Sequence, residues 1–330
     1  MRLIQLSGPE GRRLGKVEDD LIRLFETYHS VYALGTAALE SGRTLAAQAE
    51  QDLAGTLLDY PEIYEGRSAW RILPAVDHPD EPARCLVSGT GLSHIRSASN
   101  RQAMHAAGEQ LTDSMRMYLS GLEGGRPAPG AIGVAPEWFY KGTGTILRGH
   151  NEPLDVPRYA DDGGEEPEIA GAYIIDSSGA PRRIGMVAGN EFSDHQLEKK
   201  NYLYLAASKL RTCAIGPELV TDPSFDGVTG EVAILRGGER IWSKALQTGS
   251  SVMCHSLANI EHHHFKFAAH RRPGDLHIHF FGADAFSFGE GIQLTDGDVM
   301  EVHFEGLGRP LHNTVRLDAE PDSLVAVRPI

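Results

Sequence analysis

The sequence predicts an α+β fold that is mostly β, with a small α/β unit followed by a larger β-rich domain. Short apolar runs separated by glycine-containing turns recur toward the C-terminal end, for example at residues 299–304 and 311–317, and this pattern is typical of packed short strands. A Gly237-Gly238 pair between two strand-like runs predicts a hairpin over residues 231–243. A chain of 330 residues has room for one large domain and one small domain.

Residues 1–78 are expected to form the small N-terminal unit, beginning with a strand over residues 1–6. Helical spacing of apolar side chains predicts one amphipathic helix from Leu21, Leu24, Phe25 and Tyr28, and a second from Leu45, Leu53, Leu57 and Leu58. The segment 74–82 is rich in proline and acidic residues and is the expected linker. We therefore expect the large domain to occupy residues 83–330.

The composition excludes several classes of partner. The net charge of −14 argues against binding to nucleic acid or to an anionic membrane surface. The chain has no apolar run of transmembrane length, and its first residues do not resemble a signal peptide. Its three cysteines, Cys85, Cys213 and Cys254, are scattered and lack metal-ligand spacing, as expected of reduced thiols in the cytoplasm.

A run of acidic residues opens a predicted strand over residues 166–175. Side chains two positions apart on a strand share a face, so Glu166 and Glu168 should point together and Glu165 should point away. Two adjacent carboxylates repel each other and favour a bound cation. Glu191, after the next apolar run, supplies a third carboxylate. Three oxygen ligands without a nearby cysteine indicate Mg²⁺, with Mn²⁺ as the alternative, and argue against Zn²⁺.

The order of these motifs resembles the fumarylacetoacetate hydrolase superfamily over roughly residues 83–316. The matching residues are Glu166-x-Glu168, Gly185 to Ser193, Lys209, Gly216-Pro217, Arg272 to Asp275, Gly282, Thr295 to Val302 and Glu305 to Gly308. The resemblance implies a mixed β-sandwich roll for the catalytic domain and a homodimeric assembly. Each motif is weak alone, and their order and spacing together make the resemblance specific.

Within the superfamily, the segment 89–98 is similar to the branch that dehydrates 2-keto-3-deoxy sugar acids. Hydrolases of the superfamily carry a histidine and a glutamate that activate the attacking water. In this sequence Ser97 and Asn100 stand at those two positions, and neither side chain is a general base near neutral pH. The hydrolytic apparatus is therefore expected to be missing.

The resemblance also implies the residues that act on the substrate. Lys209 is the expected catalytic base or acid, because a lysine near a metal ion and away from water exchanges a proton near pH 7. The expected substrate-binding residues are Lys141, Ser93, His94, Arg96, Gly282 and Ala283. The sequence departs from the family pattern in three places: a glutamate at 191 instead of aspartate, an alanine at 283 instead of threonine, and a spacer after Lys209 that is short by about two residues. Either a gap falls in this spacer, or Arg211 assumes part of the role of Lys209.

These expectations point to a metal-dependent lyase acting on a small 2-keto acid. Chelation of the keto acid by the ion would make the C3 proton removable, and loss of the C4 hydroxyl as water would follow. The expected substrate is a 2-keto-3-deoxy-pentonate such as 2-dehydro-3-deoxy-arabinonate, and the product is 2-oxoglutarate semialdehyde. One alternative is a hydrolase of an acylpyruvate or diketo acid that uses His94 as the base, and another is a non-catalytic sugar-acid-binding protein.

A run of three histidines, residues 262–264, lies in a predicted helix over residues 251–268. Consecutive residues on a helix point in widely separated directions and do not ligate one ion together. We therefore expect this run to form a polar helix face, at a contact between subunits.

Overall fold

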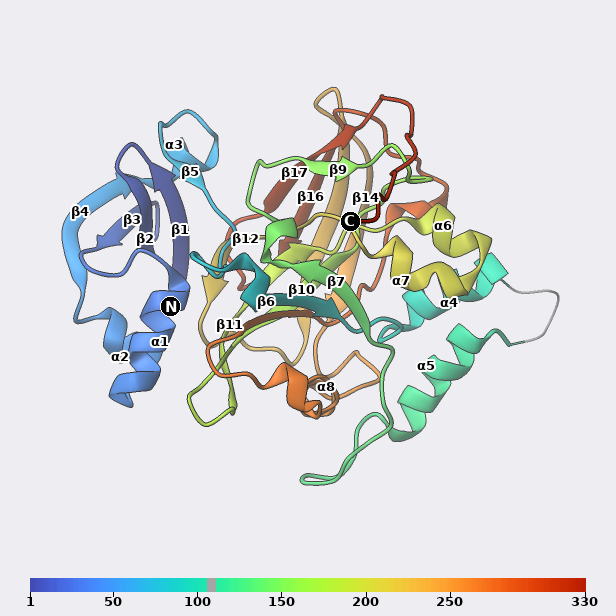
Figure 1. The fold of residues 1–330 in the computed structure, drawn as a ribbon, viewed down its shortest axis with the longest axis horizontal. Coiled ribbons are helices and arrows are strands. Elements are labelled where there is room, and N and C mark those ends of the chain that lie inside the picture. Colours follow the sequence, from blue (N-terminus) through green and yellow to red (C-terminus); the bar gives the residue numbers. More distant parts are fainter. Residues whose placement is uncertain (106–110) are drawn as a thin grey trace.

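Two mixed β-sheets form the body of the protein (Figure 1). The structure, a computed structural model, describes residues 1–105 and 111–330. Within these residues one sheet has 12 strands and the other has 5. Strands hold 34% and helices 24% of the residues, so the predicted α+β class with mostly β content is confirmed.

The strands of the larger sheet are β1 (Arg2–Gly8), β2 (Gly11–Glu18), β3 (Leu21–Phe25), β4 (Leu53–Asp59), β5 (Arg71–Ile72), β6 (Cys85–Gly89), β7 (Phe139–Thr143), β8 (Leu147–Arg148), β10 (Pro167–Ile175), β11 (Pro181–Asn190), β12 (Cys213–Val220) and β15 (Leu276–Phe280). Their spatial order is β4-β3-β2-β1-β12-β11-β10-β15-β6-β7, with β5 beside β1 and β8 beside β12. The pairs β15–β6 and β12–β8 are parallel and the other pairs are antiparallel, which makes the sheet mixed.

The strands of the smaller sheet are β9 (Leu154–Val156), β13 (Val228–Arg236), β14 (Glu239–Thr248), β16 (Val299–Phe304) and β17 (Leu311–Leu317). Their order is β14-β13-β16-β17-β9. The α-helices of the described residues are α1 (Val31–Ser41), α2 (Leu45–Ala49), α3 (Tyr60–Tyr64), α4 (Ile95–His105), α5 (Asp113–Gly124), α6 (His195–Lys200), α7 (Leu205–Ser208) and α8 (Leu257–Phe265). Short 3-10 turns are η1 (Pro82–Arg84), η2 (Gly144–Ile146), η3 (Tyr202–Tyr204), η4 (Ala268–His270) and η5 (Ser287–Glu290).

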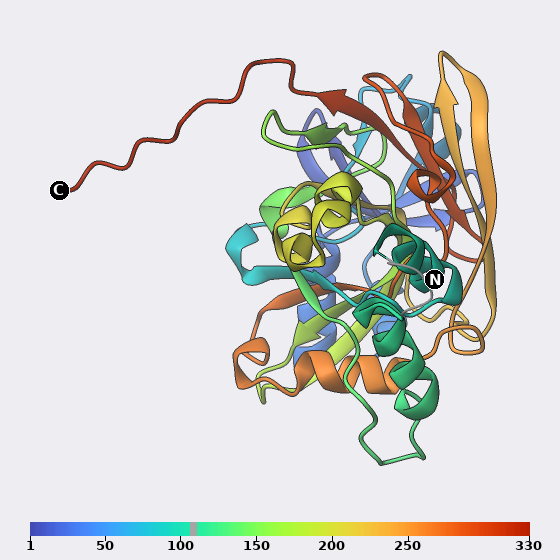
Figure 2. The same ribbon diagram turned by 90° about the vertical axis from the view of Figure 1, so that its right-hand side faces the viewer.

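The two sheets pack face to face around the main apolar core. Ile169, Met186 and Ala214 from the larger sheet are buried against Val232 and Met300 from the smaller sheet. Burial of apolar surface on this scale is the dominant stabilising term of a fold. In Figure 2, α5 and α8 lie at the same side of this body, and the residues after β17 lead away from it. The sandwich therefore positions the ends of β10 and β11 inside the protein.

The N-terminal unit differs from the prediction in its helices. The helix expected from Leu21 to Tyr28 is wrong, because Leu21–Phe25 forms β3, which pairs with β2 and β4. The apolar residues there fit a repeat of two as well as a helical repeat, since Ile22 and Leu24 are buried and Leu21 is exposed. Asp19, with a φ of 54°, lies in the turn of the hairpin between β2 and β3. Pairing in this hairpin favours a strand over a helix for residues 21–25.

The second expected helix in this unit is correct only at its start. The helix α2 ends at Ala49, and the later leucines lie in β4. The helix α1 was not expected from the sequence. Its ends carry ordinary capping signals: Ser30 accepts a hydrogen bond from the N–H of Ala33, and Gly42 adopts the left-handed conformation at the C-terminal end.

The N-terminal strands continue the larger sheet instead of forming a sheet of their own. Strand β1 pairs with β12 in antiparallel register, with Arg2 opposite Val220. The Gln5 side chain donates to the carbonyl oxygen of Pro74 at 2.7 Å and accepts from the N–H of Val31 at 2.9 Å. The proposed division between residues 78 and 83 stays a prediction.

The C-terminal half follows the prediction closely. Strands β13 and β14 form the expected hairpin, and Gly237 and Gly238 turn it with φ values of 59° and 87°. The helix expected over residues 251–268 is shorter, because Ser256 caps α8 and starts it at Leu257. The three cysteines are buried and unpaired. Of the helices in the described part of the chain, none combines the length and the apolar character needed to span a membrane.

A buried contact between the N-terminal unit and the large domain gives a test of this architecture. Tyr60 donates its hydroxyl to Glu218 Oε1 at 2.7 Å, and the Glu218 side chain is fully buried. We expect Tyr60→Phe to lower the free energy of unfolding by about 1–3 kcal/mol, because it leaves a buried carboxylate short of a donor. Denaturant unfolding measures this loss. The control Tyr159→Phe, at a residue that is 68% exposed, should change it by less than about 0.5 kcal/mol, and equal effects of the two changes would contradict the assignment.

Candidate metal centre and active site

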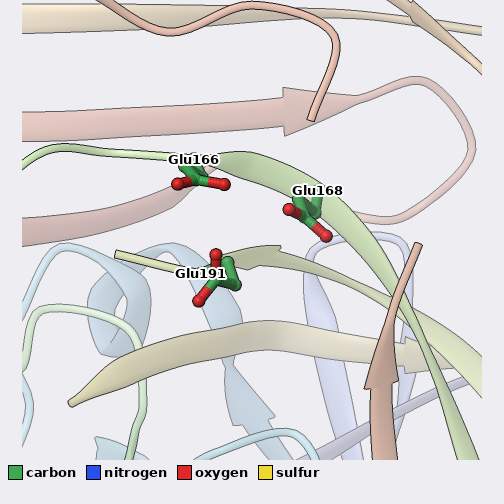
Figure 3. A group of neighbouring side chains, drawn as sticks. All are labelled: Glu166, Glu168 and Glu191. Carbon is green, nitrogen blue, oxygen red and sulfur yellow. The ribbon is translucent and has the colours of Figure 1, made fainter. Parts of the chain in front are cut away.

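Three buried carboxylates converge where β10 begins and β11 ends. Glu166 lies just before β10, Glu168 lies within it, and Glu191 directly follows β11. One oxygen from each side chain lies within 4.8 Å of the others. Figure 3 shows the three carboxylates facing a common point from the two strands. Glu165 faces away and accepts a 2.8 Å hydrogen bond from the Ser287 hydroxyl, as the alternation of side chains along a strand predicts.

Backbone contacts fix the two strand ends that carry these ligands. The N–H of Glu191 donates to the carbonyl oxygen of Glu166 at 2.9 Å. The side-chain oxygen of Asn190 accepts from the N–H groups of both Glu166 and Phe192 at 3.2 Å. Phe192 has a φ of 21°, an uncommon value for a residue with a side chain. Asn190 therefore holds the sharp turn that directs Glu191 toward the other two carboxylates.

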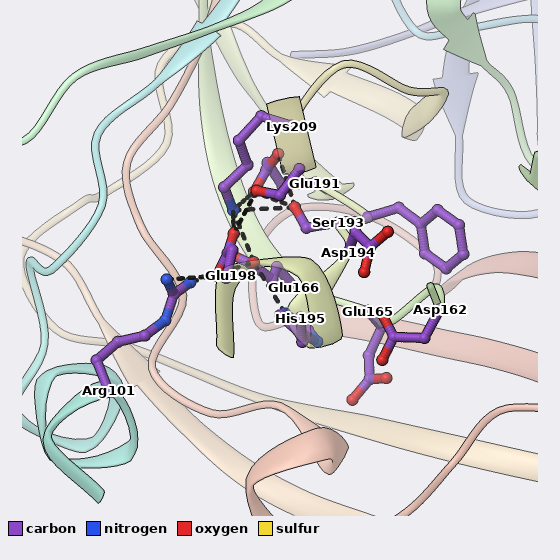
Figure 4. A network of polar contacts seen from close by, with 12 residues as sticks. Arg101, Asp162, Glu165, Glu166, Glu191, Ser193, Asp194, His195, Glu198 and Lys209 are labelled. Carbon is purple, nitrogen blue, oxygen red and sulfur yellow. Dashed lines mark hydrogen bonds and ion pairs between the residues drawn. The ribbon is translucent and has the colours of Figure 1, made fainter. Parts of the chain in front are cut away.

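Two buried lysines contact members of this group. Lys209 Nζ donates to Glu166 Oε1 at 2.7 Å, Glu191 Oε2 at 2.6 Å and Ser193 Oγ at 2.9 Å (Figure 4). Lys209 thus lies directly against two of the three carboxylates, and its role as catalytic base or acid stays a prediction.

Lys141, on β7, contacts one of these carboxylates, Glu191. Its Nζ contacts Glu191 Oε1 at 2.7 Å and also donates to the carbonyl oxygens of Phe192 and Lys209 at 2.7 and 3.0 Å. These contacts use all three donors of the ammonium group. Lys141 therefore orients Glu191, and no donor is left over for the substrate carboxylate in this arrangement.

Burial and neighbouring charges shift the pKa values of these carboxyl groups and of Lys209. Burial raises the pKa of Glu168 well above its usual value, and the charges of Glu191 and Glu166 add to the effect. Burial alone would raise the pKa of Glu166 as well, but Lys209 and His195 lower it well below the usual value. Burial alone would lower the pKa of Lys209, and the attraction of the carboxylates outweighs it and raises that pKa. Lys209 is therefore a protonated ammonium while no other cation binds the three glutamates.

His195 forms a further hydrogen bond to the Glu166 carboxylate. Its Nε2 lies 3.0 Å from Glu166 Oε1, and its ring stacks on Phe286 with 4.7 Å between centroids. A side chain on Gly164 would overlap the His195 ring, so that glycine is required for the histidine to fit. An enclosed histidine that donates to a ligand carboxylate orients the ligand, in the manner of other outer-shell partners of metal sites.

Two further charged residues were not predicted from the sequence. Arg101 on α4 pairs with the buried Glu198 and lies 3.9 Å from Glu166. Glu137 precedes β7, and its Oε1 is buried without a hydrogen-bond partner. Burial raises the pKa of Glu137 to about 7, although Arg101 and Lys209 favour the ionised form. Nothing in the local sequence marks either residue, since a single arginine in a helix and a single glutamate after a proline are common surface features.

The charges of the cluster favour a divalent cation. Its five carboxyl groups outnumber the cations Arg101, Lys141 and Lys209 by two among the described residues, so they are not all balanced unless some stay protonated or a further cation binds. The carboxylates are Glu137, Glu166, Glu168, Glu191 and Glu198. Carboxylate oxygens are the ligands that hard ions such as Mg²⁺ bind. Glu166, Glu168 and Glu191 fit such an ion by donor chemistry and by their mutual distances.

The remaining predicted substrate residues divide into two groups. Gly282 and Ser93 lie at the centre: the N–H of Gly282 donates to Glu168 Oε2 at 2.7 Å, and Ser93 Oγ packs against Gly282. Ala283 follows and is buried. His94 has both ring nitrogens engaged, with Ser93 Oγ at 2.9 Å and Thr248 Oγ1 at 3.0 Å.

Arg96 lies apart from the three glutamates. It binds Asp284 Oδ2 at 3.0 Å and the carbonyl oxygen of Ala245 at 3.1 Å, and its side chain is 48% exposed. Arg96 and His94 therefore hold loops together in this structure, and their roles in substrate binding stay predictions.

A hollow of about 320 Å³ opens between α4, α6 and η5, beside this cluster. Asn100, Gln196, Lys199 and Phe288 contribute to its lining. Phe288 also contacts the His195 ring at 5.2 Å between centroids. The hollow thus shares a wall with the residues that surround Glu166.

Substitution of Glu168 separates charge repulsion from cation binding. We expect Glu168→Gln to leave the melting temperature of the metal-free protein equal or higher, because it removes a buried carboxylate that neighbouring charges repel. In the wild type, Mg²⁺ at 100 times its Kd should add about 2.7 kcal/mol of stability, and the variant should lose most of this gain. Thermal unfolding with and without Mg²⁺ measures both effects. A variant that Mg²⁺ stabilises as much as the wild type would exclude Glu168 as a ligand.

Comparison with known proteins places this site in context. No family model matches the chain. A probable 2-keto-3-deoxyxylonate dehydratase of Haloferax volcanii is 27% identical over 220 residues, which are 65% of this chain and 68% of that protein. A 2-dehydro-3-deoxy-D-arabinonate dehydratase of Saccharolobus solfataricus is 37% identical over 90 residues, which are 27% of this chain and 29% of that protein.

The fold has a counterpart among solved structures. A 2-keto-3-deoxy-D-arabinonate dehydratase complexed with magnesium and 2,5-dioxopentanoate superposes with a TM-score of 0.72 at 19% identity, over 97% of this chain and 100% of that one. This likeness confirms the predicted fold. The fold and the two sequence relatives thus make the chain similar to 2-keto-3-deoxy-pentonate dehydratases.

Proposed function

We propose that the protein removes water from a 2-keto-3-deoxy-pentonate, such as 2-dehydro-3-deoxy-arabinonate, and releases 2-oxoglutarate semialdehyde. It would then be a hydro-lyase that requires Mg²⁺, with Mn²⁺ as a substitute. The observation that carries the proposal is the arrangement around the three glutamates. A lysine contacts two of them directly, and Glu137, a carboxyl group with a buried, unpartnered oxygen, lies near the same lysine.

Glu166, Glu168 and Glu191 would hold the ion, and its charge would stabilise negative charge on the 2-oxo oxygen of the substrate. Lys209 is the group we expect to accept the C3 proton. In the metal-free protein the carboxylates keep Lys209 protonated. Once their charge is neutralised, burial is the dominant influence left on Lys209, and burial lowers the pKa of an ammonium group. Lys209 then exchanges a proton near neutral pH.

Glu137 is the group we expect to protonate the leaving hydroxyl. The C3–H bond breaks toward Lys209, the C4–O bond breaks with a proton from Glu137, and one water leaves. The C3–C4 double bond then moves to C4–C5 by loss of a C5 proton and return of a proton at C3. The resulting enol tautomerises to the C5 aldehyde. Burial keeps a large fraction of Glu137 protonated near pH 7, as a general acid requires.

The carboxylate and hydroxyl groups of the substrate would find partners in Arg101 and in the residues that line the neighbouring hollow. The guanidinium of Arg101 is buried, and its Nε has no hydrogen-bond acceptor, which makes it the cation we expect to face the substrate carboxylate or a hydroxyl. The hollow lined by Asn100, Gln196 and Lys199 offers the polar groups that a hydroxylated chain needs.

The hydrolase alternative is less well supported. Ser97 and Asn100 stand where the water-activating pair would be. His94, the base that this alternative requires, has both ring nitrogens bonded to other side chains, and burial lowers its pKa to about 3. His195 is enclosed and donates to Glu166, so its position suits ligand support and not activation of a water molecule.

A cytoplasmic homodimer belongs to the same proposal. The family resemblance supports the dimer, and the three buried, unpaired cysteines suit a reducing compartment.

Turnover is the direct test of the proposed reaction. We expect purified protein with Mg²⁺ to convert 2-keto-3-deoxy-pentonate to semialdehyde, measured by coupling to an aldehyde dehydrogenase. Glu168→Ala should reduce kcat by roughly 10³-fold or more, because it removes an ion ligand worth several kcal/mol, while circular dichroism shows that the variant is folded. Loss of ultraviolet absorbance from an acylpyruvate instead would indicate the hydrolase. Binding of the keto acid without turnover would indicate a binding protein.

The pH dependence of turnover tests the role of Glu137. Because the protonated form acts and its pKa is about 7, kcat should fall as pH rises through that value. We expect Glu137→Gln to lower kcat by about 10²–10⁴-fold and to remove this alkaline limb. Glu239→Gln, at an exposed hairpin residue, is the matched control and should leave the profile unchanged. An alkaline limb that persists in Glu137→Gln would assign it to another group.

A further inference from the structure

The segment that carries Glu137 has no regular structure of its own. Residues 131–138 form neither helix nor strand between α5 and β7. Backbone N–H and carbonyl groups in such a segment need partners from elsewhere. Before it, at the end of α5, the N–H of Ser256 donates to the carbonyl oxygen of Gly125, and Arg126 donates to the carbonyl oxygen of Met253. The chain that leads into the segment is therefore attached to the residues that lead into α8.

The side chain of Asn259, on α8, makes hydrogen bonds to the backbone of this segment that a neighbouring strand would otherwise make. Its side-chain oxygen accepts from the N–H of Gly133 at 3.0 Å, and its side-chain nitrogen donates to the carbonyl oxygen of Val134 at 2.9 Å. Asn259 is buried, so loss of either hydrogen bond leaves polar groups without water.

His263, one helical turn further along α8, holds the other side of Gly133. Its Nε2 lies 3.0 Å from the carbonyl oxygen of Gly133, and Lys266 Nζ lies 3.0 Å from its Nδ1. A carbonyl oxygen only accepts and an ammonium group only donates, so the proton of His263 is on Nε2. The carbonyl oxygen and the N–H of Gly133 are thus both held by α8.

His264 holds the segment at the residue next to Glu137. Trp138 Nε1 donates to His264 Nδ1 at 3.2 Å, and His264 Nε2 lies 2.9 Å from Nδ1 of His277 on β15. An indole N–H only donates, so Nδ1 of His264 is the acceptor and its Nε2 carries the proton that His277 accepts. The larger sheet therefore fixes His264, and His264 fixes Trp138.

The histidine run thus has two members that face the segment and one that does not. His263 and His264 are buried, whereas His262 is exposed. The expected polar surface face is therefore wrong for two of the three residues. Divergent directions on the helix, which exclude a shared metal ion, also explain why neighbouring histidines have separate tasks.

We propose that Asn259, His263 and His264 are positioning residues for catalysis: they hold residues 133–138 on α8 and so set the place of the Glu137 carboxyl group. This inference rests on the proposed function, because it gives the general acid a support outside the metal site. The placement is tight. A side chain on Gly91 would overlap the Glu137 carboxylate, so a small displacement of the segment would move this group away from Lys209 and Arg101.

Hydrogen exchange and kinetics on the same variants test this latch, by which we mean the hydrogen bonds from Asn259, His263 and His264 to residues 133–138. We expect Asn259→Ala to accelerate exchange of the Gly133 amide by roughly tenfold, since one protecting hydrogen bond is lost, and Asn259→Asp, which keeps the acceptor, to have a smaller effect. Both Asn259→Ala and His264→Phe should lower kcat by about tenfold or more with KM changed less than about twofold, as expected for a displaced acid group. His262→Ala is the matched control on the same helix and should change neither quantity. Peptides from β13 report whether each variant is folded.

The outcomes separate the latch from the proposed reaction. Faster exchange in residues 131–138 together with a lower kcat supports the latch. Unchanged exchange in both variants, or faster exchange with an unchanged kcat in an active enzyme, overturns it. A wild-type protein that does not turn over the keto acid overturns the dehydratase proposal, and faster exchange in the variants would then still establish that α8 holds the segment.

Discussion

The structure depends on the balance of charge around three buried glutamates. Carboxylates cost free energy when they leave water, and several of them in one place repel each other. Lys209 supplies compensating charge, with Lys141 and Arg101 beside it. A divalent ion bound by all three glutamates would neutralise them more fully than one lysine that contacts two of them. The same geometry therefore explains why the site favours a hard cation and why the basicity of Lys209 would change when that cation binds.

The fold serves this balance by bringing distant segments to one point. Strand pairing between β10 and β11 places Glu166 and Glu168 opposite the end of the strand that leads to Glu191. The Asn190 side chain then fixes the backbone around Glu191 by accepting hydrogen bonds from the N–H groups of Glu166 and Phe192. Glu137, the proposed acid, comes from a different direction, on a segment without secondary structure that α8 supports. Strands hold the proposed ion ligands, whereas side-chain hydrogen bonds hold the segment that carries Glu137, so the two parts of the proposed site are supported differently.

The three glutamates that meet in the structure were predictable from the sequence because a strand repeat and an ordered set of motifs mark them. Glu166 and Glu168 follow the repeat of a strand, and the motif order located Glu191 and Lys209. Glu137, Arg101 and His195 carry no such pattern, since only the folded chain brings them to the three carboxylates. In the N-terminal unit, the apolar residues from Leu21 to Phe25 satisfy two periodicities, and the turn before them decides for the strand. The roles of His263 and His264 were also out of reach, because they depend on a loop that is distant in the sequence.

Binding of Mn²⁺ followed by electron paramagnetic resonance tests the central claim most directly, because it reports the ion, its stoichiometry and its contact with a keto acid. We expect one Mn²⁺ per chain, a signal that changes when 2-oxobutyrate is added, and loss of binding when Glu166, Glu168 and Glu191 are replaced together by glutamine. Mn²⁺ that stays free in solution, or that binds equally well to the triple variant and ignores the keto acid, would contradict the assignment of these glutamates as a catalytic metal centre.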